Sequence, residues 1–248
     1  MKIRLVFGLL IVLAQGLGAS TAFASAPNSA TCTGGTIAAG TYSSLTVTGN
    51  CTFEDGATVI VNGNVRVADG AVLNDHAGST ASVFITGNVT VGKGAVLGLG
   101  SYNPFTTSTT VVNGNIIASQ PLSLYLSEMT VHGNVVSNGG GSGPAGEFRN
   151  FPTKDDVIDG NLIVQGWQGG WLGVIRVQVG GNLIVSNNAS VLTEEGPGVD
   201  TDSTEVMTNV VAGNLVCQGN SPAAQVNPLD FGQPNVVGGQ KIGQCAGL

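Results

Sequence analysis

The chain has 248 residues and a formal net charge of −7, with only 9% charged residues and 39 glycines. This acidic balance lacks the basic surface that nucleic acids and anionic membranes attract, so we expect neither as a partner. Low charge with abundant Gly, Val, Thr and Asn favours dense β-structure with many turns over disorder.

Residues 1–24 have the pattern of a secretory signal peptide. Lys2 and Arg4 precede an apolar run at 5–13, and Ala22-Phe23-Ala24 is a small-residue cleavage site. An uncleaved membrane anchor is the alternative, but the run is shorter than the ~20 residues of a spanning helix. The sequence therefore predicts an exported single domain at 25–248, with no membrane association after cleavage.

The mature chain is expected to begin with an N-terminal cap at about 25–50. Within it, Leu45-Thr46-Val47-Thr48 alternates between apolar and polar residues, as in a half-buried strand.

A Gly-Asn pair, followed in most copies by an aliphatic residue, then recurs at irregular spacing. Gly63-Asn64-Val65-Arg66-Val67 and Gly87-Asn88-Val89-Thr90-Val91 are the clearest copies. The repeated asparagines are Asn64, Asn88, Asn115, Asn134, Asn161, Asn182 and Asn214. A short unit repeated with insertions is typical of a solenoid, in which each unit buries its apolar face against its neighbours.

Short strand-like runs flank each Gly-Asn pair, and no segment shows a capped helical period. The sequence therefore predicts an all-β, single-stranded right-handed parallel β-helix of about eight coils, with Gly-Asn at a bend of each coil. Glycine reaches the backbone conformations of such a bend freely and asparagine tolerates them. Stacked asparagine amides are expected to form a ladder, with residues such as Val65 and Val67 pointing inward.

Four cysteines lie near the two ends of the mature chain, at Cys32, Cys51, Cys217 and Cys245. Four cysteines allow three pairings, and an exported chain favours disulfides. Because the ends of an elongated fold lie far apart, we expect Cys32–Cys51 and Cys217–Cys245, capping the two ends, with a C-terminal cap at about 217–248. Zinc ligation is disfavoured because a C-x-x-C pair and a neighbouring His are missing.

An insertion at Ser137–Arg149 interrupts the repeat and is followed by Lys154, Asp155, Asp156 and Asp159. It is interpreted either as a flexible loop or as a substrate loop whose groove is lined by Arg149 and the aspartates.

Both tryptophans, Trp167 and Trp171, lie in a glycine-rich frame. They either stack against sugar rings or fill the interior and corners of the coil. The candidate ligand-binding residues are thus Trp167, Trp171, Arg149, Asp155 and Asp156.

The acidic run Thr193–Glu205 supplies many oxygen ligands, but it lacks the order of calcium motifs, so a solvated loop is favoured over a metal site. The threonines, including Thr106–Thr110, are too irregular for an ice-binding or crystal-binding face. His76 and His132 are isolated from any nucleophile motif. The sequence predicts no catalytic residue, metal or cofactor.

The Gly-Asn-aliphatic units, the segment Gly166–Val177 and the ending from Val211 through Gly243-Gln244-Cys245 resemble a family of secreted bacterial right-handed β-helix proteins of uncharacterised function. The resemblance covers nearly all of the mature chain and implies fold and export, but no catalytic residues. More distantly, the repeats resemble bactofilins, which are polymer-forming cytoskeletal β-helices; the signal peptide, cysteines and long insertions depart from them. Pectate lyases share the expected architecture without matching calcium or arginine motifs, and fold alone does not imply their activity.

We therefore expect an exported, non-catalytic β-solenoid of the cell envelope or extracellular matrix, secreted or at the cell surface, with polysaccharide or cell-wall components as partners. One alternative is a carbohydrate-active enzyme, a lyase or hydrolase, using Asp155, Asp156 and Asp159 with Arg149 or Arg176. The other is a protein that self-associates end to end into a polymer.

Overall fold

The computed structural model describes residues 28–76, 80–101, 109–143, 149–191, 204–226 and 232–248. The predicted signal peptide, residues 144–148 of the insertion, Thr106–Ser108 and most of the acidic run lie outside these ranges. The described residues are all-β, and none of them forms a helix that is long and apolar enough to cross a membrane.

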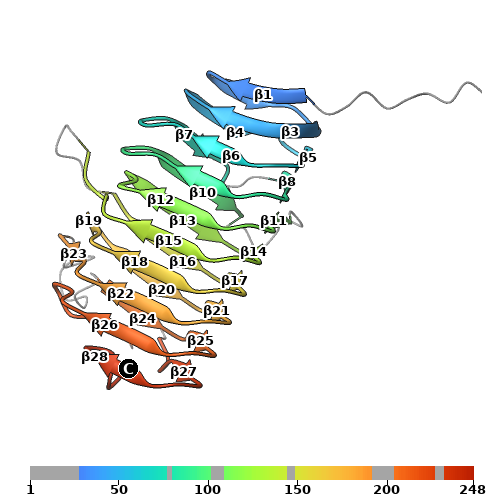
Figure 1. The fold of residues 1–248 in the computed structure, drawn as a ribbon. Helices are drawn as coiled ribbons and strands as arrows, with labels where there is room; N and C mark the ends of the chain where they lie inside the picture. The colour runs from blue at the N-terminus through green and yellow to red at the C-terminus, as the bar shows by residue number, and fades with distance from the viewer. Residues whose placement is uncertain (1–27, 77–79, 102–108, 144–148, 192–203, 227–231) are drawn as a thin grey trace, which may run out of the picture.

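The strands stack into three faces, and every pairing between strands is parallel (Figure 1). Face one consists of β1 (Asn28–Cys32), β3 (Gly40–Val47), β6 (Val65–Val67), β9 (Val89–Val91), β12 (Ile116–Ser119), β15 (Val135–Asn138), β18 (Leu162–Gln165), β22 (Leu183–Ser186), β26 (Leu215–Gln218) and β28 (Lys241–Gly243).

Face two starts from the first half of β3, and together with face one it forms the 18-stranded sheet. Its other strands are β5 (Thr58–Val61), β8 (Ser82–Ile85), β11 (Thr110–Val112), β14 (Met129–Val131), β17 (Val157–Ile158), β21 (Gln178–Val179), β25 (Val210–Val211) and β27 (Val236–Val237).

Face three is an eight-stranded sheet. It comprises β2 (Gly35–Ile37), β4 (Asn50–Phe53), β7 (Val72–Asn74), β10 (Val96–Gly100), β13 (Ser123–Ser127), β16 (Phe151–Lys154), β20 (Leu172–Ile175) and β24 (Thr204–Met207). A small pair, β19 (Gln168–Gly169) and β23 (Ala189–Ser190), lies between faces one and three in the chain.

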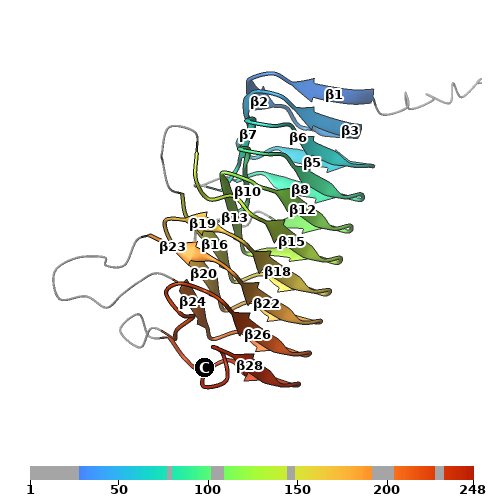
Figure 2. The same cartoon turned by 60° about the vertical axis from the view of Figure 1, so that its left-hand side comes forward.

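Each round of the chain visits face two, face one and face three in turn, as in β5, β6, β7 and then β8, β9, β10. Each strand pairs with its equivalent one round later, for example β6 with β9 and β7 with β10. Figure 2 shows the resulting stack turned by 60° from the view of Figure 1, with its solenoid-like succession of layers. The prediction of an all-β structure with parallel strands is confirmed.

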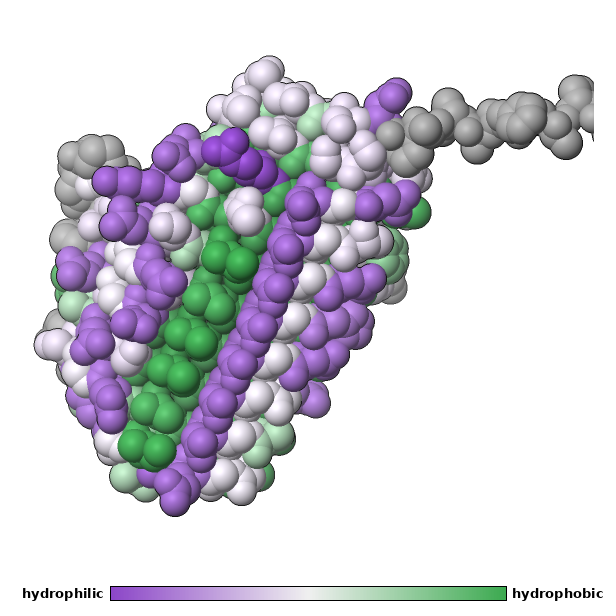
Figure 3. Space-filling view, viewed as in Figure 1, coloured by the Kyte–Doolittle hydropathy of each residue, from purple (hydrophilic) through white to green (hydrophobic). Residues whose placement is uncertain are grey.

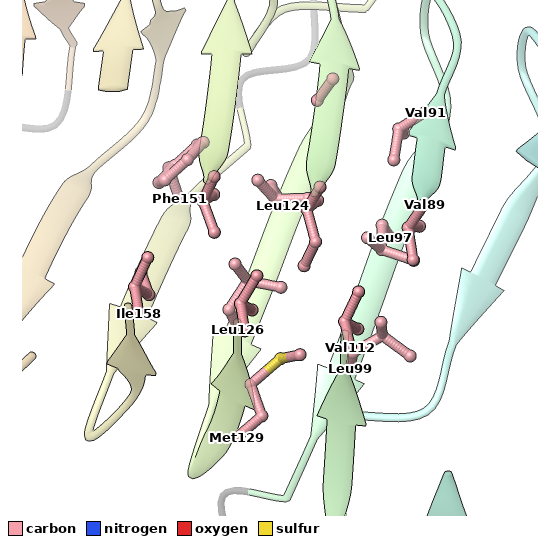
Figure 4. Close-up of a cluster of buried hydrophobic side chains, with 14 of the residues drawn as sticks. Val89, Val91, Leu97, Leu99, Val112, Leu124, Leu126, Met129, Phe151 and Ile158 are labelled. Atoms are coloured by element: carbon pink, nitrogen blue, oxygen red, sulfur yellow. The ribbon is translucent and has the colours of Figure 1, made fainter. Parts of the chain in front are cut away.

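Alternation along each short strand sends every second side chain into the interior. Val65 and Val67 are buried, Arg66 between them is exposed, and each of the two valines pairs in register with its counterpart in β9. Figure 4 shows how such rows from neighbouring layers pack together. Full burial of one such aliphatic side chain is worth about 1.5–3 kcal/mol, so the stacked rows hold successive layers together.

The Gly-Asn corner lies between faces two and one and works by close stacking. None of its glycines has a positive φ, so the expected need for unusual backbone angles is wrong at this corner. A Cβ on Gly160 would instead lie 2.6 Å from Asn134 Oδ1 and 2.6 Å from the Gly133 carbonyl oxygen. Glycine is required because any side chain would collide with the layer before it.

Asparagine amides run along this corner as a hydrogen-bonded ladder. The Asn161 main-chain N–H donates to Asn134 Oδ1 over 2.8 Å, and the Asn161 amide donates to the same oxygen over 2.9 Å. Equivalent bonds link Asn64, Asn88, Asn115, Asn134, Asn161, Asn182 and Asn214, and Gln240 donates its N–H to the last of them. At the corner, the asparagine main-chain N–H groups do not hydrogen-bond to a carbonyl of the neighbouring strand. The side-chain oxygens of the ladder accept these N–H groups instead.

The other two corners use left-handed residues. After face one they include Gly70, Gly94, Gln120, Gly139, Gly166, Asn187, Gly219 and Gly243; after face three they include Gly56, Gly100, Glu128, Asp155, Arg176 and Thr208. The left-handed conformation of a residue other than glycine lowers the stability of the fold by roughly 1–2 kcal/mol. The packing of neighbouring layers must offset this loss.

Two disulfides join Cys32 to Cys51 and Cys217 to Cys245, with Cα atoms 6.4 and 5.1 Å apart. The first links β1 of face one to β4 of face three, and the second ties β26 to the C-terminal segment. These are the local pairs expected from the sequence. Such bonds persist in an oxidising, extracytoplasmic environment.

Candidate functional site

A small pocket opens on the outer side of face three, with a volume of about 210 Å³. It is lined by His76, Tyr125, Ser127, Asn150, Pro152, Lys154 and Trp171. Three of these residues are aromatic rings and most of the others carry a polar group, a mixture typical of small-ligand sites.

Strand register assembles this pocket from segments far apart in the sequence. Tyr125 and Ser127 belong to β13, and Ser127 pairs in register with Lys154 of β16. Pro152 pairs with Gly173 of β20, directly after Trp171 and Leu172. Three successive layers therefore contribute to one hollow, and His76, which follows β7 two layers earlier, joins them.

Gly173 makes room for the Trp171 indole. A Cβ at Gly173 would lie 2.1 Å from the indole, so the ring lies against the bare backbone of this glycine. The Trp171 main-chain N–H donates to Asn150 Oδ1 over 3.1 Å, and Lys154 Nζ lies 4.9 Å from the ring centroid. The hydrogen bond holds the main chain of Trp171, and the cation–π contact holds the half-buried ring.

His76 forms a second aromatic wall. Its ring centroid lies 5.4 Å from that of Tyr125, and its Nε2 lies 2.8 Å from Ser127 Oγ. Burial, with a smaller contribution from the Lys154 charge, lowers the pKa of His76 below 6.5, so the imidazole is neutral at pH 7.

The His76–Ser127 pair resembles a base beside a nucleophile, but Ser127 is 0% exposed. Its side chain has no exposed surface from which to attack a substrate, so the hydrogen bond serves to fix the imidazole. The arrangement is suited to binding.

A larger cleft of about 880 Å³ lies at the corner between faces one and three. Its lining is rich in glycine and includes the polar side chains of Asp69, Lys93, Gln120 and Gln168 beside Gly139–Gly140 and Ser142–Gly143 of the insertion. The Lys93 main-chain N–H donates to Asp69 Oδ1 over 3.1 Å. None of the described residues that line this cleft is aromatic, so it offers a ligand no ring to stack against.

The two tryptophans have opposite placements. Trp167 is 0% exposed and packs edge-on against Phe151, with ring centroids 5.1 Å apart. It belongs to the core, the interior placement that the sequence left open, and presents no ring face to a ligand. Of the two, Trp171 lines the pocket on face three.

The charged candidates do not gather at this pocket. Arg176 forms a bidentate pair with Asp155, with Nε–Oδ1 and Nη2–Oδ2 distances of 2.6 Å. Asp159 Oδ2 lies 2.6 Å from Nδ1 of His132. Arg149 is exposed, and its main chain bonds to Gly141 and Gly170. None of these residues lines the pocket at Trp171.

Asp156 is buried at the corner between faces three and two and is not available to a ligand. Its Oδ1 accepts the Met129 N–H over 3.1 Å, while Oδ2 has no hydrogen-bond partner. Burial raises the pKa of this carboxyl well above 3.8, and the nearby Asp155 and Glu128 charges add to the rise against the Met129 hydrogen bond.

Among the described residues, no three His, Cys, Asp or Glu side chains gather as metal ligands. The acidic run with its possible calcium ligands lies mostly outside those residues.

Sequence reasoning missed Tyr125, His76, Asn150 and Lys154 as neighbours of Trp171. His76 and Ser127 are 51 positions apart, and insertions of different length separate the layers of face three. The available signal was Gly173, a glycine inside an apolar strand, which commonly marks close approach of another group.

Comparison of the chain with protein-family models, curated proteins and solved structures finds no match. The likeness to secreted β-helix proteins inferred from the repeats therefore stays a prediction.

Proposed function

We propose that the chain is an exported structural protein of the cell envelope or extracellular matrix, folded as a single-stranded right-handed parallel β-helix, that binds polysaccharide through the pocket at Trp171. The fold part of the proposal is supported by the parallel pairing of each strand with its equivalent one round later. Export is supported by the signal-peptide pattern and by the two disulfides.

The observation that carries the binding proposal is the Trp171 indole held against Gly173 beside polar groups. Indole is a large rigid surface that loses little entropy on binding, and it suits the apolar face of a sugar ring. Asn150, Lys154 and the neutral His76 supply hydrogen-bonding groups around it, as sugar hydroxyls require.

The non-catalytic part is supported by the positions of the candidate acids. Glycoside hydrolysis needs two carboxyl groups across one bond, separated by about 5–9.5 Å in a shared groove. Asp155 is paired with Arg176 and Asp156 is buried, so neither is free to take part.

The test is a panel of purified polysaccharides presented to the oxidised mature chain, with retention and release of reducing ends both measured. We expect retention of at least one polymer without release of ends. Trp171→Ala should weaken retention about tenfold or more, since stacked aromatic anchors contribute on the order of 1–3 kcal/mol to a site.

The matched control is Phe84→Ala, which removes an exposed aromatic ring from face two. It should leave retention unchanged. Cleavage of a polymer, or equal retention by the Trp171→Ala chain, would contradict the proposal.

A further inference from the structure

Face one carries a continuous row of outward-pointing aliphatic side chains, here called the apolar stripe. Strand register places the members directly above one another. They are Ile117, Val136, Ile163, Ile184, Val216 and Ile242. Figure 3 shows the stripe as a green band along the face, bordered on one side by the purple band of the asparagine ladder.

The fold itself does not require aliphatic residues at these positions. In the layers before the stripe, the same outward position is occupied by Thr46, Arg66 and Thr90. These layers stack in the same register although the residue at this position is polar. The corresponding row of face two is interrupted by Thr130 and Gln178. Since polar residues serve equally well at outward positions of this stack, the unbroken stripe indicates a surface that meets a partner.

The strands that carry the stripe are uncharged from β12 through β26, and Lys241 beside Ile242 in β28 is the one charged residue on these strands. From β12 through β26, the strands of face one and the adjoining ladder asparagines contain no ionisable side chain. The strand ends opposite the ladder are uncharged as well, at Ser119, Asn138, Gln165, Ser186 and Gln218. The whole chain has a net charge of −7, so this is a face on which two copies meet without like-charge repulsion.

We propose that the apolar stripe is the contact face of an antiparallel side-by-side homodimer. Sheets pack face to face about 10 Å apart by interdigitating rows of side chains with a spacing of about 4.8 Å along the stack. A second copy presents a row with this same spacing, and a two-fold axis brings the same patch into contact on both copies.

The antiparallel arrangement follows from the composition of the row. An axis passing between Ile163 and Ile184 places the Ile117 end of one stripe against the Ile242 end of the other. It also keeps the two Arg66 side chains at opposite ends of the dimer, whereas a parallel arrangement would bring them together.

The size of the stripe sets the strength of the contact. The stripe is six layers long, at about 4.8 Å per layer, and its strands are about four residues wide, at about 3.3 Å per residue. The contact area is therefore roughly 400 Å² per copy. A total of roughly 800 Å² lies in the range of weak, transient complexes, so the dimer forms in a concentration-dependent equilibrium.

The experiment is sedimentation of the oxidised mature chain over about three decades of concentration, extending to about 1 mM as expected for weak interfaces. We expect a dimer whose fraction rises with concentration. The double variant Ile163→Thr and Ile184→Thr should reduce association at least tenfold, and threonine keeps the β-branched shape already accepted in this row at Thr90.

The matched control is the double variant Val111→Thr and Val157→Thr, which alters outward residues of face two. It should sediment as the unaltered chain does. A spin label on Thr90→Cys then reports orientation, since antiparallel copies hold the labels about 30–35 Å apart and parallel copies about 10 Å.

A monomer at every concentration overturns the proposal, as does a dimer that survives the stripe variant. A short distance between labels overturns the antiparallel geometry. If the stripe variant loses polysaccharide retention while association is unchanged, the occupant of the stripe is a polymer and the homodimer is wrong. Trp171→Ala lies on face three and should leave association intact, which separates this proposal from the binding function.

Discussion

Face one and face three are built by the same layers of chain, yet they differ in regularity. The connection from face two into face one is a short Gly-Asn corner in layer after layer, as between Val131 and Val135. The connections into and out of face three are variable, with Asn138 followed by Phe151 and Ser190 by Thr204 at the next strand of the chain. Face one therefore repeats, and face three collects residues of different chemistry.

This difference distinguishes two groups of residues in the sequence, those of the repeat and those around the insertions. The repeated residues specify how layers stack, so their substitution should destabilise the fold. The residues around the insertions are constrained less by stacking, so their substitution should affect binding more than stability. Besides the tests at Trp171 and at the apolar stripe, three stability measurements sharpen this comparison.

The largest effect is expected at the Gly-Asn corner. Gly160→Val places side-chain atoms where the Asn134 amide and the Gly133 carbonyl lie, at Cβ distances of 2.6 Å. We expect destabilisation by about 3 kcal/mol or more, measured as the free energy of unfolding in guanidinium. Gly247→Ala is the control, because nothing lies within 4 Å of that position. Equal stability of the two variants would refute the stacking role of the corner.

A smaller loss is expected in the asparagine ladder. Asn134→Ala removes the oxygen that accepts both the main-chain N–H and the amide of Asn161, leaving a half-buried N–H unpaired. The expected cost is about 1–3 kcal/mol. Asn138→Ala changes an exposed asparagine at the end of β15 and should cost far less. If both variants melt alike, the ladder adds nothing beyond the strand pairing.

The smallest effect is a gain at Asp156. Its native pKa is raised above the 3.8 of the unfolded chain, so its stability contribution is complete below pH 3.8 and declines as pH rises toward the native pKa. Asp156→Asn removes this decline and should raise the melting temperature at pH 7, by about 2–4 °C for each kcal/mol regained. The gain should shrink towards pH 4.

Exposed Asp55→Asn is the control for this measurement and should show no such trend. A gain that is independent of pH, or a loss at pH 7, would show that the buried carboxyl is not the cause.

The repeated motif allowed the stacking of the layers to be predicted from the sequence. Buried residues that stack outside this motif were not predicted. Val65 and Val67 point inward because strands alternate, which the sequence shows directly. Asn188 and Asn220 also form a buried ladder, in which Asn188 donates its N–H to Asn220 Oδ1 over 3.1 Å. Asn188 follows Asn187 rather than a glycine, and the Gly219-Asn220 pair is followed by Ser221 rather than an aliphatic residue, so the repeat pattern did not identify them.

The site was less predictable because it depends on register. Trp167 and Trp171 occupy the same glycine-rich segment, and only the stacking of the layers decides which one is buried. His76 meets Tyr125 and Ser127 across two rounds of chain whose lengths vary with the insertions. A spacing rule learned from the Gly-Asn corners cannot place such residues.

The two disulfides have a consequence for where the molecule comes apart. In a linear stack, each layer is held only by its neighbours, so thermal opening begins at the two ends, where a layer has a single neighbour. Cys32–Cys51 and Cys217–Cys245 close covalent loops at these two ends. The redox state of the surroundings therefore controls local unfolding of the end layers. With both disulfides formed, the ends of the stack resist proteases. In a reducing compartment, unfolding starts at both ends and proceeds toward the middle of the stack.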